Sequence, residues 1–144
     1  MSNERPATPP IVPHLVIRGA ADAAAFYERA FGAKIESLMK MPDGRVMHGA
    51  LTLPNGGVFF VMDPPEGKSA GESNVVIHLE VADVDASWKK ACDAGATVRM
   101  ELADQFWGAR YGILTDPFGH TWSLATQKRD VSPEELERAA RQYA

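Results

Sequence analysis

Two stretches of the chain, HLVIRGAADAAAFYERAFGA at residues 14–33 and HLEVADVDASWKKACDAGA at residues 78–96, follow one pattern. Each opens with His-Leu in an apolar run typical of a β-strand. Each continues into a helical segment, the first rich in alanine and the second preceded by Asp83, a good N-cap residue. Both helical segments end at Gly-Ala, and glycine commonly follows the C-terminus of a helix. The repeated order predicts two copies of one β–α unit.

Each predicted helix is followed by three strand-like runs separated by turn residues. In the first half the runs cover residues 34–40, 45–53 and 58–63. In the second half they cover residues 96–102, 110–115 and 121–126, with the turn Asp116-Pro117-Phe118-Gly119 before the last run. The sequence therefore predicts an α+β chain of two tandem βαβββ units, at about residues 11–64 and 75–128.

The two ends of the chain differ from this core. Residues 1–10 are polar and proline-rich, which predicts a flexible lead. Residues 129–144 form a charged extension in which Ser132, Pro133 and Glu135 make the capping box that starts a helix. We expect this short C-terminal helix to be a surface appendage that docks on a partner such as a second subunit.

Composition excludes several classes of protein. The 144 residues amount to one domain, and a net charge of −4 argues against a nucleic-acid binder. Cys92 is the single cysteine, so an intrachain disulfide and a cysteine-based zinc site are both excluded. No apolar run approaches the roughly 18 residues of a membrane-spanning helix. The start has no apolar core of a signal peptide, so we expect a cytoplasmic protein without a membrane partner.

Four motifs carry a resemblance to a known family: AAAFYERAFGA, GRVMHGAL, DQFWGARYG and DPFGHTWSLAT. They resemble the vicinal oxygen chelate superfamily, which includes glyoxalase I, bleomycin resistance proteins and extradiol dioxygenases, and in particular its PhnB-like branch. The resemblance covers roughly residues 11–136. It implies that each βαβββ unit forms a curved half-sheet and that two half-sheets enclose a concave site, in some members across a dimer interface.

The resemblance also implies where metal ligands would lie. In the metal enzymes a His on the first strand and a Glu on the last strand of each unit bind Zn, Ni, Fe or Mn. Here those positions fall on Val12, Val76, Phe60 and Ser123, none of which is a normal ligand. The sequence therefore predicts a metal-independent member with no cofactor.

His14 and His78 lie two residues beyond the missing ligands. Because side chains alternate along a strand, both should share the face of those ligands. Together with Glu80 they form the alternative ligand set, should a divalent metal bind at displaced positions. The other interpretation is that both histidines are hydrogen-bonded residues of a pocket wall.

Strand alternation then predicts a ligand pocket. Its expected lining residues are His14, Phe60, Met62, His78, Glu80 and Ser123, with Phe106, Trp107 and Arg110 at its mouth. Arg110 there would favour an anionic or carbonyl-bearing ligand. The alternative is that Trp107 packs its loop onto the sheet and Arg110 pairs with Asp104 or Asp116.

Three further aromatic residues bear on this pocket. The family register places Trp122 outward beneath a helix, opposite in direction to Ser123, and Trp88 should pack its helix onto the sheet. The face that His48 occupies is left open by the sequence.

The predicted function is binding of a small molecule in an apolar, aromatic pocket without a metal. The alternative is a metal-dependent lyase, isomerase or dioxygenase that acts on a substrate with vicinal oxygens. A third hypothesis is an interaction module whose C-terminal helix makes the contacts. Whether the protein is an enzyme is left open; as one it would be a glyoxalase-type lyase or a dioxygenase. A homodimer is expected, because open half-sheets leave edges and apolar surface to be covered.

Overall fold

The structure is a computed structural model that describes residues 7–143, so residues 1–6 of the predicted lead and Ala144 lie outside it. The chain alternates strands and helices in the order expected for two βαβββ units. The elements are β1 (His14–Val16), α1 (Ala20–Phe31), β2 (Lys34–Lys40), β3 (Val46–Thr52), β4 (Val58–Met62), β5 (Val76–Glu80), α2 (Val84–Ala94), β6 (Thr97–Asp104), β7 (Ala109–Thr115), β8 (Thr121–Gln127) and α3 (Pro133–Arg141).

The strands form two four-stranded sheets, in the orders β1-β4-β3-β2 and β5-β8-β7-β6. In each sheet the first strand of the unit pairs in parallel with the last strand, and the other neighbours are antiparallel. The predicted α+β class with tandem βαβββ units and a short C-terminal helix is therefore confirmed. Strand β1 begins at His14, later than the predicted start at Val12, and the carbonyl of Pro13 accepts the next bond from the N–H of Phe60 at 2.8 Å.

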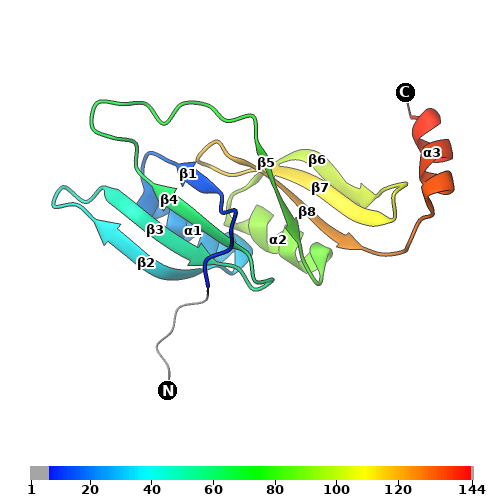
Figure 1. The fold of residues 1–144 in the computed structure, drawn as a ribbon, viewed down its shortest axis with the longest axis horizontal. Helices are drawn as coiled ribbons and strands as arrows, with labels where there is room; N and C mark the ends of the chain where they lie inside the picture. Colours follow the sequence, from blue (N-terminus) through cyan, green and yellow to red (C-terminus); the bar gives the residue numbers. More distant parts are fainter. Residues whose placement is uncertain (1–6, 144) are drawn as a thin grey trace, which may run out of the picture.

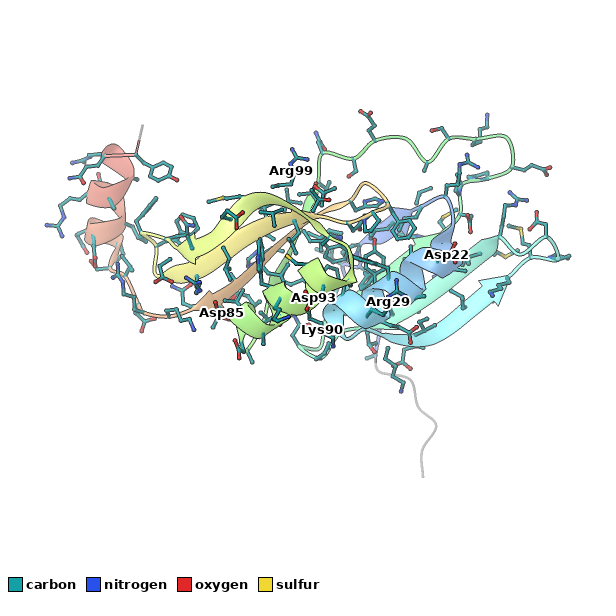
Figure 2. The ribbon with its side chains drawn as sticks, turned by 180° about the vertical axis from the view of Figure 1, so that it is seen from behind. Asp22, Arg29, Asp85, Lys90, Asp93 and Arg99 are labelled. Carbon is teal, nitrogen blue, oxygen red and sulfur yellow. The ribbon has the colours of Figure 1, made fainter. Side chains whose placement is uncertain are left out.

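The two sheets lie side by side, and α1 and α2 cover the same face of the pair (Figure 1). Seen from behind, both helices lie in front of the strands, and Asp85 marks the start of α2 (Figure 2). Helix α3 lies apart, beyond one end of the second sheet (Figure 1). Within residues 7–143 none of the helices is long and apolar enough to cross a membrane.

Trp122 on β8 joins the two units in one core. Its fully buried ring lies 5.3 Å from the ring of Tyr27, 4.7 Å from that of Phe31 and 5.4 Å from that of Phe59, measured between centroids. All three partners belong to the first unit. The expected position of Trp122 beneath a helix is confirmed, and the helix is α1 of the other unit.

The carboxylate of Asp116 fixes the turn before β8 to this core. It accepts hydrogen bonds from the hydroxyl of Tyr27, from Nε1 of Trp122 at 2.8 Å, and from the backbone N–H groups of Phe118 and His120 at 2.8 and 3.0 Å. Asp116 is buried. Burial, and secondarily the nearby Asp116 carboxylate, raise the pKa of Tyr27 above its ordinary value, so its hydroxyl stays a donor. One buried acid therefore joins the first helix to the last turn.

Gly112 on β7 lets α2 approach the second sheet. A Cβ atom at this position would lie 2.6 Å from the ring of Trp88 and 3.0 Å from the Cα of Leu102. Trp88 packs on the sheet as predicted, and it does so directly over a residue that has no side chain.

Candidate functional site

Strand alternation separates each sheet into a covered face and a free one. On β4, the buried Phe59 and Val61 point toward the helices, and Phe60 between them is partly exposed on the other side. We call the side of both sheets that lies away from α1 and α2 the open face. The predicted pocket residues on it are His14, Phe60, Met62, His78, Glu80 and Ser123, joined by His48 and Tyr111.

Three rings cluster on the open face of the first sheet. His14 is paired in register with Phe60, and their ring centroids lie 5.7 Å apart. The ring of His48 lies 5.7 Å from His14 and 4.6 Å from Phe60, so the question that the sequence left open is settled in favour of this face. Partial burial, and after it the neighbouring His48, lower the pKa of His14 below its ordinary value of 6.5.

This pKa shift gives a testable pH dependence. In the variant His48→Gln, we expect the pKa of His14 to rise part of the way back to its ordinary value. The substitution removes the charge repulsion between the two imidazoles, whereas His14 stays partly buried. Since the fold binds a proton at His14 less tightly than the unfolded chain does, the free energy of unfolding should decrease slightly as the pH falls below the unfolded value of about 6.5. NMR titration of the imidazole signals measures the shift. An unchanged or lower pKa of His14 in the variant would contradict this assignment.

On the second sheet, His78 connects two polar residues. Its Nδ1 lies 2.7 Å from Oγ of Ser123, and its Nε2 lies 2.7 Å from Oε1 of Glu80. The register of the parallel pair β5·β8 sets His78 opposite Ser123, and Glu80 is two residues further along the same face. Ser123 is 1% exposed, whereas the side chains of His78 and Glu80 are 41% and 62% exposed.

A row of aromatic rings leads to His78. The ring of Tyr111 stacks on it at 5.8 Å and 22°, and Trp107 contacts Tyr111 edge-on at 5.5 Å. Phe106 continues the row at 5.1 Å from Trp107, and Tyr143 near the C-terminus lies 5.4 Å from Phe106. Phe106 and Trp107, which the sequence predicts at the mouth of the site, are thus linked to His78 by Tyr111. The sequence analysis did not include Tyr111 in the site.

Gly108 shapes the loop that carries these aromatics. Its φ of +93° lies in the left-handed region, and a Cβ there would overlap the carbonyl oxygen of Arg129. The backbone N–H groups of Lys128 and Arg129 donate to the Gly108 carbonyl at 2.8 and 3.2 Å. Only glycine allows this close approach of the chain that leads to α3.

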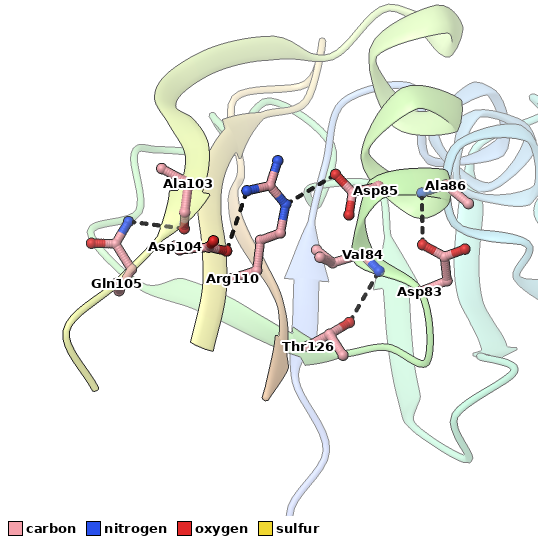
Figure 3. A network of polar contacts seen from close by, with 9 residues as sticks. All are labelled: Asp83, Val84, Asp85, Ala86, Ala103, Asp104, Gln105, Arg110 and Thr126. Atoms are coloured by element: carbon pink, nitrogen blue, oxygen red, sulfur yellow. Dashed lines mark hydrogen bonds and ion pairs between the residues drawn. The ribbon is translucent and has the colours of Figure 1, made fainter. Parts of the chain in front are cut away.

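Arg110 is paired with two carboxylates, as in the alternative that the sequence left open, and is directed to the side of the sheet that α2 covers. Its Nε donates to Asp85 on α2 at 3.0 Å and its Nη1 to Asp104 at 3.3 Å (Figure 3). These bonds raise the pKa of Arg110, that with Asp85 first. The alternative pairing with Asp104 is present, and Asp116 is not a partner. Because Tyr111 occupies the open face, its neighbour Arg110 must point to the opposite side.

The two halves of the predicted pocket meet only in part. His14 and His78 both line a hollow of about 480 Å³ between β1 and β5, together with Val12, Val76 and neighbouring residues. Phe60 and Met62 stay on the first sheet and Glu80 and Ser123 on the second, outside the lining of this hollow. Of the six predicted lining residues, His14 and His78 therefore line this hollow together.

The donor set of the described chain does not fit the family's metal site. In residues 7–143, no three His, Cys, Asp or Glu side chains are grouped so that they could hold a metal ion. The alternative ligand set of His14, His78 and Glu80 is divided between two clusters. His14 contacts His48, whereas both ring nitrogens of His78 are hydrogen-bonded, one to Ser123 and one to Glu80.

Comparison with known proteins agrees with this architecture. The chain belongs to the Glyoxalase/Bleomycin resistance protein/Dioxygenase superfamily, whose model matches residues 11–124. It is 44% identical over 139 residues to Uncharacterized protein Mb0911c of Mycobacterium bovis, with 91% of each chain covered.

Two solved structures show the same fold. Protein PA1353 from Pseudomonas aeruginosa has a TM-score of 0.71 at 24% identity and covers 85% of this chain and 100% of its own. A PhnB protein from Bacillus cereus, described as a putative 3-demethylubiquinone-9 3-methyltransferase, has a TM-score of 0.60 at 24% identity and covers 82% and 99%. The superfamily resemblance inferred from the four sequence motifs is confirmed by the family model.

Proposed function

We propose that the protein binds a small molecule on the open face of its second sheet and needs no metal to do so. The observation that carries the proposal is the row Phe106–Trp107–Tyr111–His78, which ends at the polar residues Glu80 and Ser123. Aromatic walls with a few polar groups that fix orientation are the usual form of a small-molecule site.

The charges beside this row define the ligand further. Arg110 is paired with two carboxylates on the opposite face, so it is not placed to bind an anionic ligand. The exposed carboxylate of Glu80 is instead the charged group next to His78. A ligand with a flat apolar body and a hydrogen-bond donor directed at Glu80 suits this surface.

A ligand screen on three variants tests the proposal. Trp107→Ala should weaken binding by about 1–3 kcal/mol, because a stacked aromatic contact is lost. Arg110→Ala is the matched control, since Arg110 lies close by in sequence and points away from the ligand. His14→Ala shows whether the first sheet takes part. Calorimetric titration with the best hit measures the affinities, and equal losses in the Trp107 and Arg110 variants would place the site elsewhere.

Metal independence rests on the residues at the family's ligand positions. Val12, Val76 and Phe60 have side chains without a donor atom, and Ser123 is held by His78. Elemental analysis of protein purified without a metal-affinity tag should find no stoichiometric metal after dialysis against a weak chelator. Stoichiometric Zn, Ni, Fe or Mn that disappears in His14→Ala or His78→Ala would favour the metal-dependent lyase, isomerase or dioxygenase instead.

We also propose that a second copy packs against apolar parts of the open face in a homodimer and leaves the row at His78 accessible. In residues 7–143 no helix lies on this face, and it carries exposed apolar side chains such as Met39, 57% exposed, and Val76, 46% exposed. Two-fold dimers are the commonest assembly that covers such a surface. Light scattering at micromolar concentration should give twice the 15.7 kDa chain mass. A monomeric mass would contradict the proposal, and Met39→Glu should shift the dimer toward monomer.

A further inference from the structure

We propose that Ser123, His78 and Glu80 form a nucleophile–base–acid triad that accepts small acyl groups. This would be an activity in addition to ligand binding, on the same face of the second sheet. An activated serine is recognised by a base within hydrogen-bond reach and a third group that orients the base. The two distances of 2.7 Å, from Ser123 to His78 and from His78 to Glu80, meet that criterion.

The chemistry of the three groups fixes the direction of the hydrogen bonds. An ionised carboxylate can only accept, so Nε2 of His78 must carry the proton that faces Glu80. In the neutral imidazole Nδ1 then carries a lone pair and accepts a hydrogen bond from the hydroxyl of Ser123. The roles are those of a Ser-His-Asp triad with the two ring nitrogens exchanged, and such triads are recognised by geometry and not by sequence order.

The sheet holds the three groups in place before any acyl donor arrives. Ser123 and His78 are direct neighbours in the β5·β8 register, and Glu80 shares the strand of His78. The stacked ring of Tyr111 limits rotation of the imidazole. Ser123 lies between Trp122 and Leu124, both fully buried in the core, so its position on the strand is fixed. Preorganisation on strands is what a catalytic constellation requires.

The proposed reaction is an acyl transfer whose reactants are an ester and water. Oγ of Ser123 forms a bond to the carbonyl carbon of an ester while its proton passes to Nδ1 of His78, and Glu80 stabilises the imidazolium. The ester C–O bond then breaks, and the leaving oxygen takes the proton from His78. Water repeats the sequence to release the acid and restore Ser123. Because Ser123 is 1% exposed, we restrict the proposal to small acyl groups such as acetyl.

The test uses p-nitrophenyl acetate with the purified full chain. We expect release of p-nitrophenolate and, by mass spectrometry of peptides, an acetyl group on Ser123. The acetyl group should be absent in Ser123→Ala, and His78→Gln should slow acylation by about 100-fold or more, since general-base catalysis contributes at least that factor. Glu80→Gln should slow it as well, and Ser123→Cys should restore a modifiable nucleophile at the same place.

His14→Gln is the matched control, because it removes a histidine from the open face of the other sheet. Circular dichroism of each variant establishes that it is folded. The proposal is overturned if wild-type Ser123 takes up no acetyl group, or if His14→Gln slows acylation as much as His78→Gln. Ligand binding is measured separately through Trp107→Ala, so a failed acylation with intact binding rejects the triad and leaves the proposed function standing.

Discussion

Replacing Asp116 by alanine should cost about 3–5 kcal/mol of unfolding free energy, a large share of the stability of a single domain. The variant leaves the hydroxyl of Tyr27 and Nε1 of Trp122 buried without their acceptor, together with two backbone N–H groups of the turn. Each buried donor left unpaired costs about 1–3 kcal/mol, and partial relaxation of the turn keeps the total below the full sum. Urea unfolding followed by the tryptophan fluorescence measures the change.

Two further variants distinguish the loss of the buried acceptor Asp116 from the loss of an aspartate that only forms a turn. Asp43 also accepts the backbone N–H two residues on, at 3.0 Å, but in an exposed turn of the first unit, so Asp43→Ala should change stability far less. Tyr27→Phe removes one donor and leaves the acid with its other partners, so it should cost roughly 1 kcal/mol. A loss in Asp116→Ala no larger than in Asp43→Ala would show that the buried acid does not join the two units.

Asp116 also shows what the sequence could and could not predict. Asp-Pro-Phe-Gly identifies a turn from local residue types alone, and the structure has the turn there. That its carboxylate reaches Tyr27, 89 residues earlier, depends on how the two units pack. Local patterns predict elements and their ends, because these depend on residues close in sequence; contacts between units are set by tertiary packing.

The same distinction explains the candidate site. Alternation predicts opposite faces for Ser123 and Trp122 correctly, because their strand is regular and the register had an anchor. Arg110 follows a loop, and its strand β7 pairs with β6 through irregular steps between Val98 and Met100 and between Met100 and Ala103. Alternation alone does not tell which residue of the Arg110-Tyr111 pair faces outward. The sequence already offers Asp104 as a partner of Arg110, whereas the contact with Asp85 depends on how α2 packs against the sheet.

The last expected result concerns the contact between α2 and the second sheet. Gly112→Ala should lower the unfolding free energy by about 1–3 kcal/mol, because the added methyl group would lie 2.6 Å from the ring of Trp88. The Cα of Leu102 at 3.0 Å belongs to the backbone of β6 and cannot move aside, so the indole ring and α2 must move. Thermal unfolding and hydrogen exchange of the α2 amides measure the effect.

A double-mutant cycle with Trp88→Leu distinguishes crowding from a general weakness of β7. Trp88→Leu alone should destabilise the protein, since it leaves space above Gly112. In the double variant the methyl group added by Gly112→Ala partly fills that space, so the combined loss should be smaller than the sum of the two single losses. Strictly additive losses would mean that the close approach of Trp88 to Gly112 does not govern how α2 packs, and that the cost of Gly112→Ala arises within the sheet.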